Sequence, residues 1–283
     1  DPDIISMLKD FVELTAPVHG LQVSLEGFRD RYAIDDRIQF IDYSTQELQS
    51  QMTPAQVLDV LMDGNERFRT DQRLRRDLTR QTVGSSQGQH PLAVILSCID
   101  SRSPAELIFD LGLGDIFSIR VAGNIVGGKI LGSMEYATEV AGAKLIMVLG
   151  HSQCGAVTAA IQLKDSEKPI AEVTGCQHLN DVISRIEVNT SLKPGMDTEI
   201  KSQIINQTIR ENVVHSVKTI LNESQTIQKL VAQGKIAIVG AVYHVDSGIT
   251  ELLQDTFIGI NPKIIHSELR LNQSNSVINA SDK

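Results

Sequence analysis

The sequence predicts an α/β fold in which a mainly parallel β-sheet is flanked by helices and preceded by an N-terminal appendage. Short, largely apolar runs of strand length alternate along the chain with segments of helical periodicity. Such runs are typical of strands that are covered on both faces in a parallel sheet. In sheets of this kind, ligands bind beyond the carboxyl ends of the strands.

Bulk composition limits the classes of function. The hydrophobic fraction of 41% is typical of a globular chain, and the formal net charge of -9 offers no electrostatic basis for binding nucleic acid or an anionic membrane. No apolar run approaches the roughly 20 residues that cross a bilayer, and no signal peptide is visible. The first residue, Asp1, is not Met, which favours a fragment of a longer chain.

Three cysteines, Cys98, Cys154 and Cys176, are too few for a disulfide framework and are typical of a reducing compartment. Cys176 has no partner at ligand spacing, and we expect it to be a structural residue. The cysteine content favours a cytoplasmic location.

Residues 1–50 are predicted to be an appendage or linker, and residues 51–283 a single domain. Within the appendage, helical spacing of apolar residues predicts a helix over 3–14, and apolar alternation or runs favour strands over 21–25 and 37–43. The appendage carries no cluster of reactive side chains.

The domain opens with a helix that begins after Thr53, a good N-cap, at Pro54, a good first helical residue, and that ends near residue 69. Residues 70–90 are polar and are expected to form a loop with some helix. Helices are then expected over 104–111, 131–141, 155–163, 179–189 and 197–222, separated by a polar loop over 164–178. Strands are expected over 91–97, 116–121, 144–150 and 235–243.

Metal-ligand side chains follow two of these strands. Cys98 comes directly after the first, and His151 and Cys154 follow the third. Parallel strands end at one edge of the sheet, so these residues are expected to meet there. Two sulfurs and one nitrogen with a fourth position open form the ligand pattern of a catalytic rather than a structural zinc site.

Asp100 and Arg102 lie just beyond Cys98. Two thiolates make zinc a weaker Lewis acid, so a helper carboxylate is useful, and Arg102 can hold Asp100 ionised through a bidentate pair. Taken singly, each of these residues has an ordinary explanation: a small core cysteine, a satisfied histidine, a surface ion pair of little energy. The joint pattern favours a metal site. No G-x-G-x-x-G follows the first strand, so a dehydrogenase is disfavoured.

The pattern Cys98-Ile99-Asp100-Ser101-Arg102 with His151-Ser152-Gln153-Cys154-Gly155 resembles the β-class carbonic anhydrases, and the resemblance extends from about residue 53 to 248. It implies a β-carbonic anhydrase-like fold, zinc on Cys98, His151 and Cys154, and Asp100 and Arg102 as the catalytic pair. It also implies reversible hydration of carbon dioxide to bicarbonate.

The resemblance further implies a substrate pocket formed by Gln89, Phe117, Tyr136 and the backbone N–H of Gly155. In the family this pocket forms at a subunit interface, so a homodimer or higher homo-oligomer is expected. Ser103 and Ala122 depart from the usual valines. The chain has no Trp, which disfavours the bicarbonate-inhibited subtype.

Residues 20–42 resemble the segment that precedes such a domain in proteins fused to sulfate permease-type (SulP) anion transporters. This implies a cytoplasmic tail of a membrane transporter. Two alternatives to the carbonic anhydrase reading stay open at this point: a hydrolase of carbonyl sulfide or carbon disulfide on the same fold, and a non-catalytic regulatory or assembly module of a bicarbonate or sulfate transporter.

Overall fold

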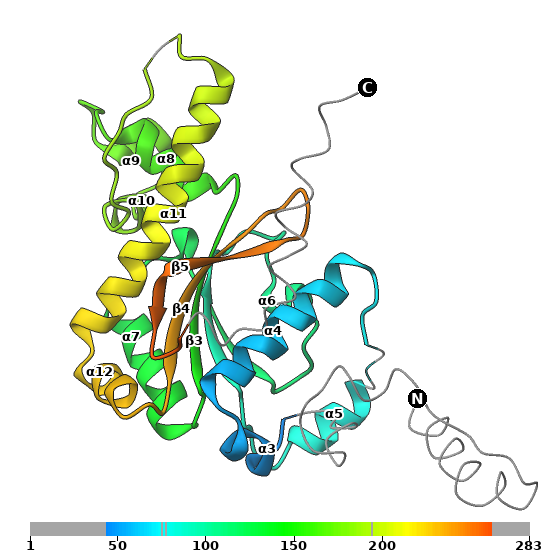
Figure 1. The fold of residues 1–283 in the computed structure, drawn as a ribbon. Helices are drawn as coiled ribbons and strands as arrows, with labels where there is room; N and C mark the ends of the chain where they lie inside the picture. Colours follow the sequence, from blue (N-terminus) through cyan, green and yellow to red (C-terminus); the bar gives the residue numbers. More distant parts are fainter. Residues whose placement is uncertain (1–43, 75, 77, 194, 262–283) are drawn as a thin grey trace, which may run out of the picture.

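The computed structural model describes residues 44–261 apart from 75, 77 and 194, and the segments expected over 3–14, 21–25 and 37–43 lie outside this range. A five-stranded sheet in the order β2-β1-β3-β4-β5 forms its centre (Figure 1). The first four strands are parallel, and β5 pairs antiparallel with β4. The strands are β1 (Ala93–Ser97), β2 (Ile116–Arg120), β3 (Leu145–His151), β4 (Ala237–Tyr243) and β5 (Thr250–Ile258).

Helices cover both faces of the sheet, as continuously apolar strands require. On one face, alternate residues of β1 and β3 such as Ile95 and Met147 pack on α4, and we call it the α4 face. The intervening residues, such as Leu96 and Val148, pack on α11, and we call the opposite side the α11 face. Figure 1 shows α4 and α11 on opposite sides of the strands. The predicted mainly parallel α/β fold is confirmed.

The α4 face is covered by α4 (Pro54–Arg69) and the short α6 (Ala105–Ile108). Helix α4 has the predicted bounds. The Thr53 hydroxyl accepts a hydrogen bond from the Gln56 N–H, and the Gln56 side chain accepts one from the Thr53 N–H. This reciprocal capping box fixes the start of the helix.

The α11 face is covered by several helices, of which α11 is the longest. They are α7 (Gly128–Glu135), which continues into a π-helical turn over Tyr136–Val140, then α8 (Gly155–Leu163), α10 (Leu179–Ile183), α11 (Thr198–Glu223) and α12 (Gln225–Ala232). Helix α8 has the predicted bounds. Helix α5 (Leu78–Ser85) lies within the predicted loop with some helix.

Several expectations were wrong in detail. The helix expected over 104–111 is the single turn α6, because Asp110 has a φ of +45°, and a right-handed helix cannot continue through that conformation. The helix expected over 179–189 is the five-residue α10. The polar loop 164–178 contains α9 (Ile170–Thr174). Neither α12 nor β5 was predicted. Cys176, expected to be structural, is exposed.

The start of the described chain lies against the domain. Helix α3 (Gln46–Gln51) spans the predicted boundary between residues 50 and 51. The buried Gln49 side chain donates hydrogen bonds to the carbonyls of Pro91 (2.7 Å) and Ala141 (2.8 Å). The Ser44 N–H donates to the Asp115 carboxylate. Residues 44–50 therefore belong structurally to the domain.

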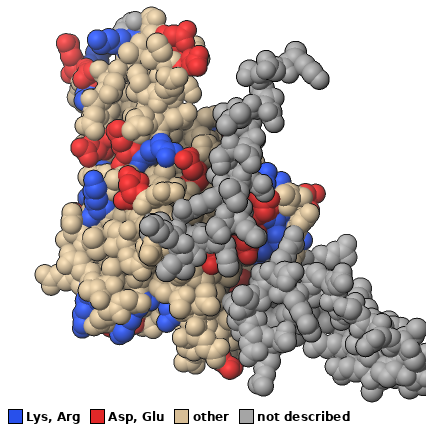
Figure 2. Space-filling model, in the orientation of Figure 1, with Lys and Arg blue, Asp and Glu red and all other residues tan. Residues whose placement is uncertain are grey.

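The surface carries charges of both signs. On the face drawn in Figure 2, acidic and basic residues occur in small mixed groups over the described part of the chain. On this face, the described residues form no continuous basic track for nucleic acid. Among the described helices, none combines the length and apolar character that crossing a bilayer requires.

Candidate metal centre

Three predicted ligands converge at the carboxyl edge of the sheet. Strands β1 and β3 are parallel neighbours with Ser97 opposite Leu149, so the residues after each strand leave from the same edge. The sulfurs of Cys98 and Cys154 and one imidazole nitrogen of His151 all lie within 4.8 Å of one another. All three side chains are buried. Within the described chain they form one cluster of metal-ligand types.

The hydrogen bonds of His151 suit a metal ligand. Its Nδ1 lies 2.9 Å from the carbonyl of Ser152, and a carbonyl can only accept, so Nδ1 carries the proton. The Nε2 atom then presents a lone pair. This atom is buried and has no hydrogen-bond partner among the described residues. A buried acceptor without a partner is costly unless something else binds it, and a cation fits.

The pKa values of the two thiols shift in opposite directions. The hydrogen bond from Cys154 lowers the pKa of the Cys98 thiol to about 4, although burial opposes the change. The same hydrogen bond, with burial, raises the pKa of Cys154. The pair is therefore poised to hold one thiolate, with a second thiol ready to ionise when a soft cation binds.

Backbone N–H groups surround both sulfurs. The Gly123 N–H lies 3.4 Å from the Cys98 sulfur. Cys154 occupies the N-cap position of α8, where the N–H groups of Ala156 and Val157 lower its pKa in part. A helix N-terminus favours negative charge, so this position stabilises a thiolate. The donor set of two sulfurs and one imidazole fits zinc.

Asp100 lies beside the cluster and is held by Arg102. The guanidinium donates to both carboxylate oxygens, from Nε to Oδ1 at 3.0 Å and from Nη2 to Oδ2 at 2.9 Å, and the Arg102 backbone N–H adds a bond to Oδ1. These bonds lower the pKa of Asp100 to about 2, against the effect of burial. Asp100 Oδ2 lies 3.9 Å from His151 Nε2, so the carboxylate faces the ligand cluster.

Other residues fix this loop, and the sequence reasoning did not assign them to the site. Arg120, at the end of β2, donates to the carbonyls of Cys98 (3.1 Å) and Asp100 (2.6 Å). Gln153 accepts from Arg102 at 3.4 Å and so joins the loops after β1 and β3. An arginine closing the strand expected over 116–121 was a usable signal for Arg120, because that strand also ends at this edge.

The predicted substrate residues are not gathered at the ligands within one chain. Gln89 is exposed and precedes β1, whereas Cys98 follows it, so a strand of about 17 Å separates them. The rings of Phe117 and Tyr136 lie 6.3 Å apart and line a hollow with Ile119. No candidate ligand lines that hollow. Gly155 does adjoin the cluster, as the first residue of α8.

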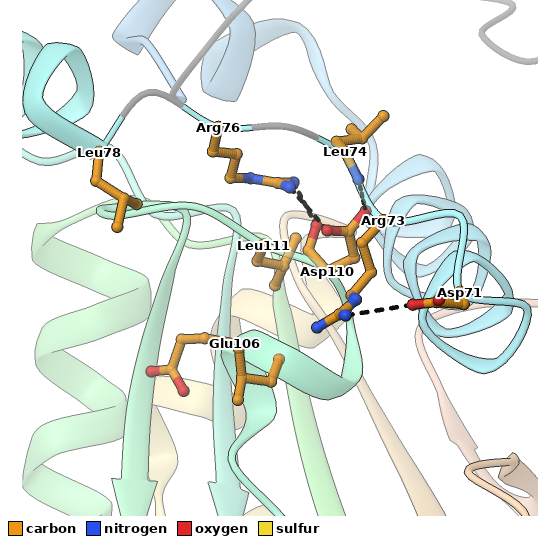
Figure 3. A pocket seen from close by; sticks show the side chains of 9 residues that line it. Asp71, Arg73, Leu74, Arg76, Leu78, Glu106, Asp110 and Leu111 are labelled. Atoms are coloured by element: carbon orange, nitrogen blue, oxygen red, sulfur yellow. Dashed lines mark hydrogen bonds and ion pairs between the residues drawn. The ribbon is translucent and has the colours of Figure 1, made fainter.

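A second hollow is lined by residues 71, 73, 74, 76 and 78 and by residues in and after α6, and none of the candidate ligands lines it (Figure 3). Its centre is the buried Asp110, which accepts from Arg67 and Arg76 and from the Leu74 N–H. These bonds satisfy the carboxylate fully. We interpret this network as the anchor of the loop before α5 rather than as a site of chemistry.

The geometry thus defines an α/β protein in which a cluster of two cysteines and one histidine could hold a metal ion beside a carboxylate–guanidinium pair. Comparison with known proteins gives the family. Residues 93–250 match the family model described as carbonic anhydrase. Carbonic anhydrase 2 of Mycobacterium tuberculosis is 36% identical over 202 residues, which cover 69% of this chain and 90% of the relative. The chain therefore belongs to the carbonic anhydrase family.

Other relatives agree. The carbonic anhydrase of Mycolicibacterium smegmatis is 37% identical over 205 residues, covering 70% of this chain and 93% of that protein. Among solved structures, the Coccomyxa β-carbonic anhydrase, crystallised with acetazolamide, superposes with a TM-score of 0.52 at 22% identity. The aligned part covers 69% of this chain and 90% of that one. The fold is that of the β class.

Proposed function

We propose that this chain catalyses the reversible hydration of carbon dioxide to bicarbonate and a proton, at a zinc ion held by Cys98, His151 and Cys154. The observation that carries the proposal is the convergence of three buried donor atoms within 4.8 Å beside an arginine-held carboxylate. Family membership supports the same activity. The relatives do not favour the alternatives of a carbonyl sulfide or carbon disulfide hydrolase and a non-catalytic transporter module.

The division of labour follows from the donor set. Zinc, when bound, supplies a Lewis acid that allows water to ionise near neutral pH. The chain supplies two thiolates and one imidazole. Because the thiolates neutralise the ion's charge, the activation of water depends more on a neighbouring acceptor than it does with three histidines.

Asp100 is that acceptor. With its pKa lowered to about 2, the carboxylate is fully ionised at neutral pH and can only accept hydrogen bonds. It faces the ligand cluster, so it can accept a hydrogen bond from the reacting water and orient it toward carbon dioxide. Arg102 binds both carboxylate oxygens from the side and keeps Asp100 from turning onto the metal.

The substrate pocket is proposed to contain Gln89, Phe117, Tyr136 and the N–H of Gly155. Gln89 lies at the opposite sheet edge of its own chain, so it can contribute only from a second copy. This supports a homodimer or higher homo-oligomer. A Gln89→Ala variant should raise KM for carbon dioxide, and mixing it with an inactive Asp100→Asn variant should restore part of the activity if the pocket is shared.

The cellular setting is proposed from the sequence. Residues 20–42 resemble the segment before such domains in SulP transporter fusions, which favours a cytoplasmic tail of an anion transporter. Sequencing the full-length transcript tests this: a hydrophobic transporter domain encoded upstream is expected. A transcript without one would contradict the fusion.

The central test combines metal analysis with stopped-flow carbon dioxide hydration from about pH 6 to 9. One zinc per chain and a rate that rises toward alkaline pH are expected. Full zinc with hydration at the uncatalysed rate across this range would refute the enzymatic proposal.

A further inference from the structure

Helix α11 carries buried polar side chains on its otherwise apolar face. Asn212 and Ser216 are each 1% exposed, and their helix neighbours Ile209, Val213 and Val217 belong to the apolar core. Burying an amide among such residues is unfavourable unless its hydrogen bonds are made. The Oδ1 atom of Asn212 has no hydrogen-bond partner among the described residues. The bond donated by Nδ2 is therefore the one that offsets the cost of burying this amide.

Both side chains hold one turn. Asn212 Nδ2 donates to the Gly123 carbonyl at 2.8 Å, and Ser216 Oγ donates to the Asn124 carbonyl at 3.2 Å. Because the two residues are four apart on the helix, their side chains face the same direction and donate to the consecutive carbonyls of Gly123 and Asn124. Gly123 itself has a φ of +68°, and a Cβ there would lie 2.8 Å from Ile186 Cδ1. The turn therefore requires glycine at position 123, and hydrogen bonds from α11 keep it in place.

The same glycine touches a candidate metal ligand. The Gly123 N–H donates to the Cys98 sulfur at 3.4 Å. A continuous path thus leads from the Asn212 amide through Gly123 to the sulfur of Cys98. Asn212 does not contact the sulfur itself. It can affect the sulfur only by fixing the position of Gly123.

We propose that Asn212 is a positioning residue of the metal centre, which holds the Gly123 N–H on the Cys98 sulfur. The inference rests on the proposed zinc site. An N–H···S bond orients the Cys98 sulfur within the ligand cluster, and it also lowers the energy of the sulfur lone pairs. Hydrogen-bonded groups behind metal ligands commonly change metal affinity or activity by ~10–100-fold.

The test compares Asn212→Leu with Thr208→Val and the wild-type protein. Leu keeps the approximate shape of Asn but donates nothing to Gly123. Thr208 lies one turn earlier on the same helix with 3% exposure, and among the described residues its hydroxyl donates within α11, to the Ile204 carbonyl. Thr208→Val therefore removes a buried polar group without disturbing the turn.

Zinc affinity is measured by competition with a chromophoric chelator, and the sulfur-to-metal charge-transfer band is measured after cobalt(II) substitution. Asn212→Leu should bind zinc at least ~10-fold more weakly, and its cobalt band should move to lower energy because the thiolate loses a hydrogen bond. Thr208→Val should match the wild type in both. Wild-type zinc affinity and an unmoved band in folded Asn212→Leu would overturn the inference.

Two further measurements distinguish failure of the proposed role of Asn212 from failure of the proposed zinc site. If Asn212→Leu does not fold, Asn212→Asp replaces it, and cadmium-113 substitution of the wild type is examined by NMR. Scalar coupling between the ion and the Gly123 amide proton is expected across the N–H···S bond, and its absence would overturn the inference. If the wild type binds no stoichiometric zinc, the proposed site itself fails, and this inference with it.

Discussion

Replacing Arg102 by Ala tests the pairing at the centre of the proposed site. The change removes both guanidinium bonds to Asp100 and leaves only the backbone N–H on Oδ1. Asp100 Oδ2 lies 3.9 Å from His151 Nε2, so without the guanidinium the carboxylate is close enough to the ligand cluster to compete for an ion that the cluster would hold. We expect zinc to stay bound while activity falls, because Asp100 then occupies the position that water needs.

The size of the loss follows from the hold on Asp100. The guanidinium bonds are the largest cause that lowers the pKa of Asp100 from 3.8 to about 2, which corresponds to a preference for the ionised carboxylate of somewhat under ~100-fold. Arg102 is 47% exposed, so solvent screening reduces this preference to about tenfold. Activity should therefore fall at least about tenfold. The activity of Arg102→Lys should lie between those of the wild type and Arg102→Ala, because an ammonium cannot bind both carboxylate oxygens in the same fork geometry.

The assay is stopped-flow hydration of carbon dioxide from about pH 6 to 9, with zinc quantified in each protein. Arg210→Ala serves as the control, because Arg210 is similarly exposed and also pairs with a carboxylate, that of Glu251, and neither forms a hydrogen bond or ion pair with a candidate ligand among the described residues. It should retain wild-type rates. Activity of Arg102→Ala within twofold of the wild type, at full zinc, would refute the reasoning.

Three further predictions concern the ligands, the domain start and acid stability. Cys154→Ser should lose zinc and activity together, whereas Cys176→Ser, which removes the exposed thiol, should retain both; full zinc in Cys154→Ser by metal analysis would refute the ligand assignment. A chain starting at Ser50 should keep its zinc but unfold at lower urea than one starting at Ser44, because the two bonds of the helix between them are worth about 1–3 kcal/mol; equal midpoints would contradict this. Asp100 has a lowered pKa in the folded state, so its contribution to stability is present above about pH 4 and is lost as the pH falls toward about 2. Urea unfolding of the metal-free protein should show this decline, and Asp100→Asn should show a flatter one; identical pH dependence would count against it.

The fold was largely predictable because its signals are local. Thr53 and Pro54 predict the start of α4, because the hydrogen bonds of an N-terminal cap involve neighbouring residues alone. The apolar runs that became β1 and β3 are buried on both faces and so are apolar up to their last residues, Ser97 and His151. By contrast, β5 mixes buried and exposed residues as an edge strand, and its identity depends on its pairing with β4. The residues of β5 alone do not predict that pairing.

The convergence of Cys98, His151 and Cys154 was predictable for a geometric reason. Parallel neighbouring strands must end at one edge, so residues that follow them are brought together whatever the remaining fold. The groups behind the ligands follow no such rule. Asn212 lies more than a hundred residues from Cys98 on a helix whose register against the sheet is set by side-chain contacts.

One of those contacts shows how the register arises. A Cβ at Gly150 would lie 2.6 Å from Val213, so α11 can approach β3 this closely only because glycine stands there. That approach carries Asn212, the residue before Val213, to the Gly123 carbonyl. A side chain at Gly150 would push α11 outward and weaken the hold on the turn before any ligand moved. The metal centre is thus supported by a packing contact on its own strand, and Gly150→Ala should lower zinc affinity in the same direction as Asn212→Leu, measured in the same chelator competition.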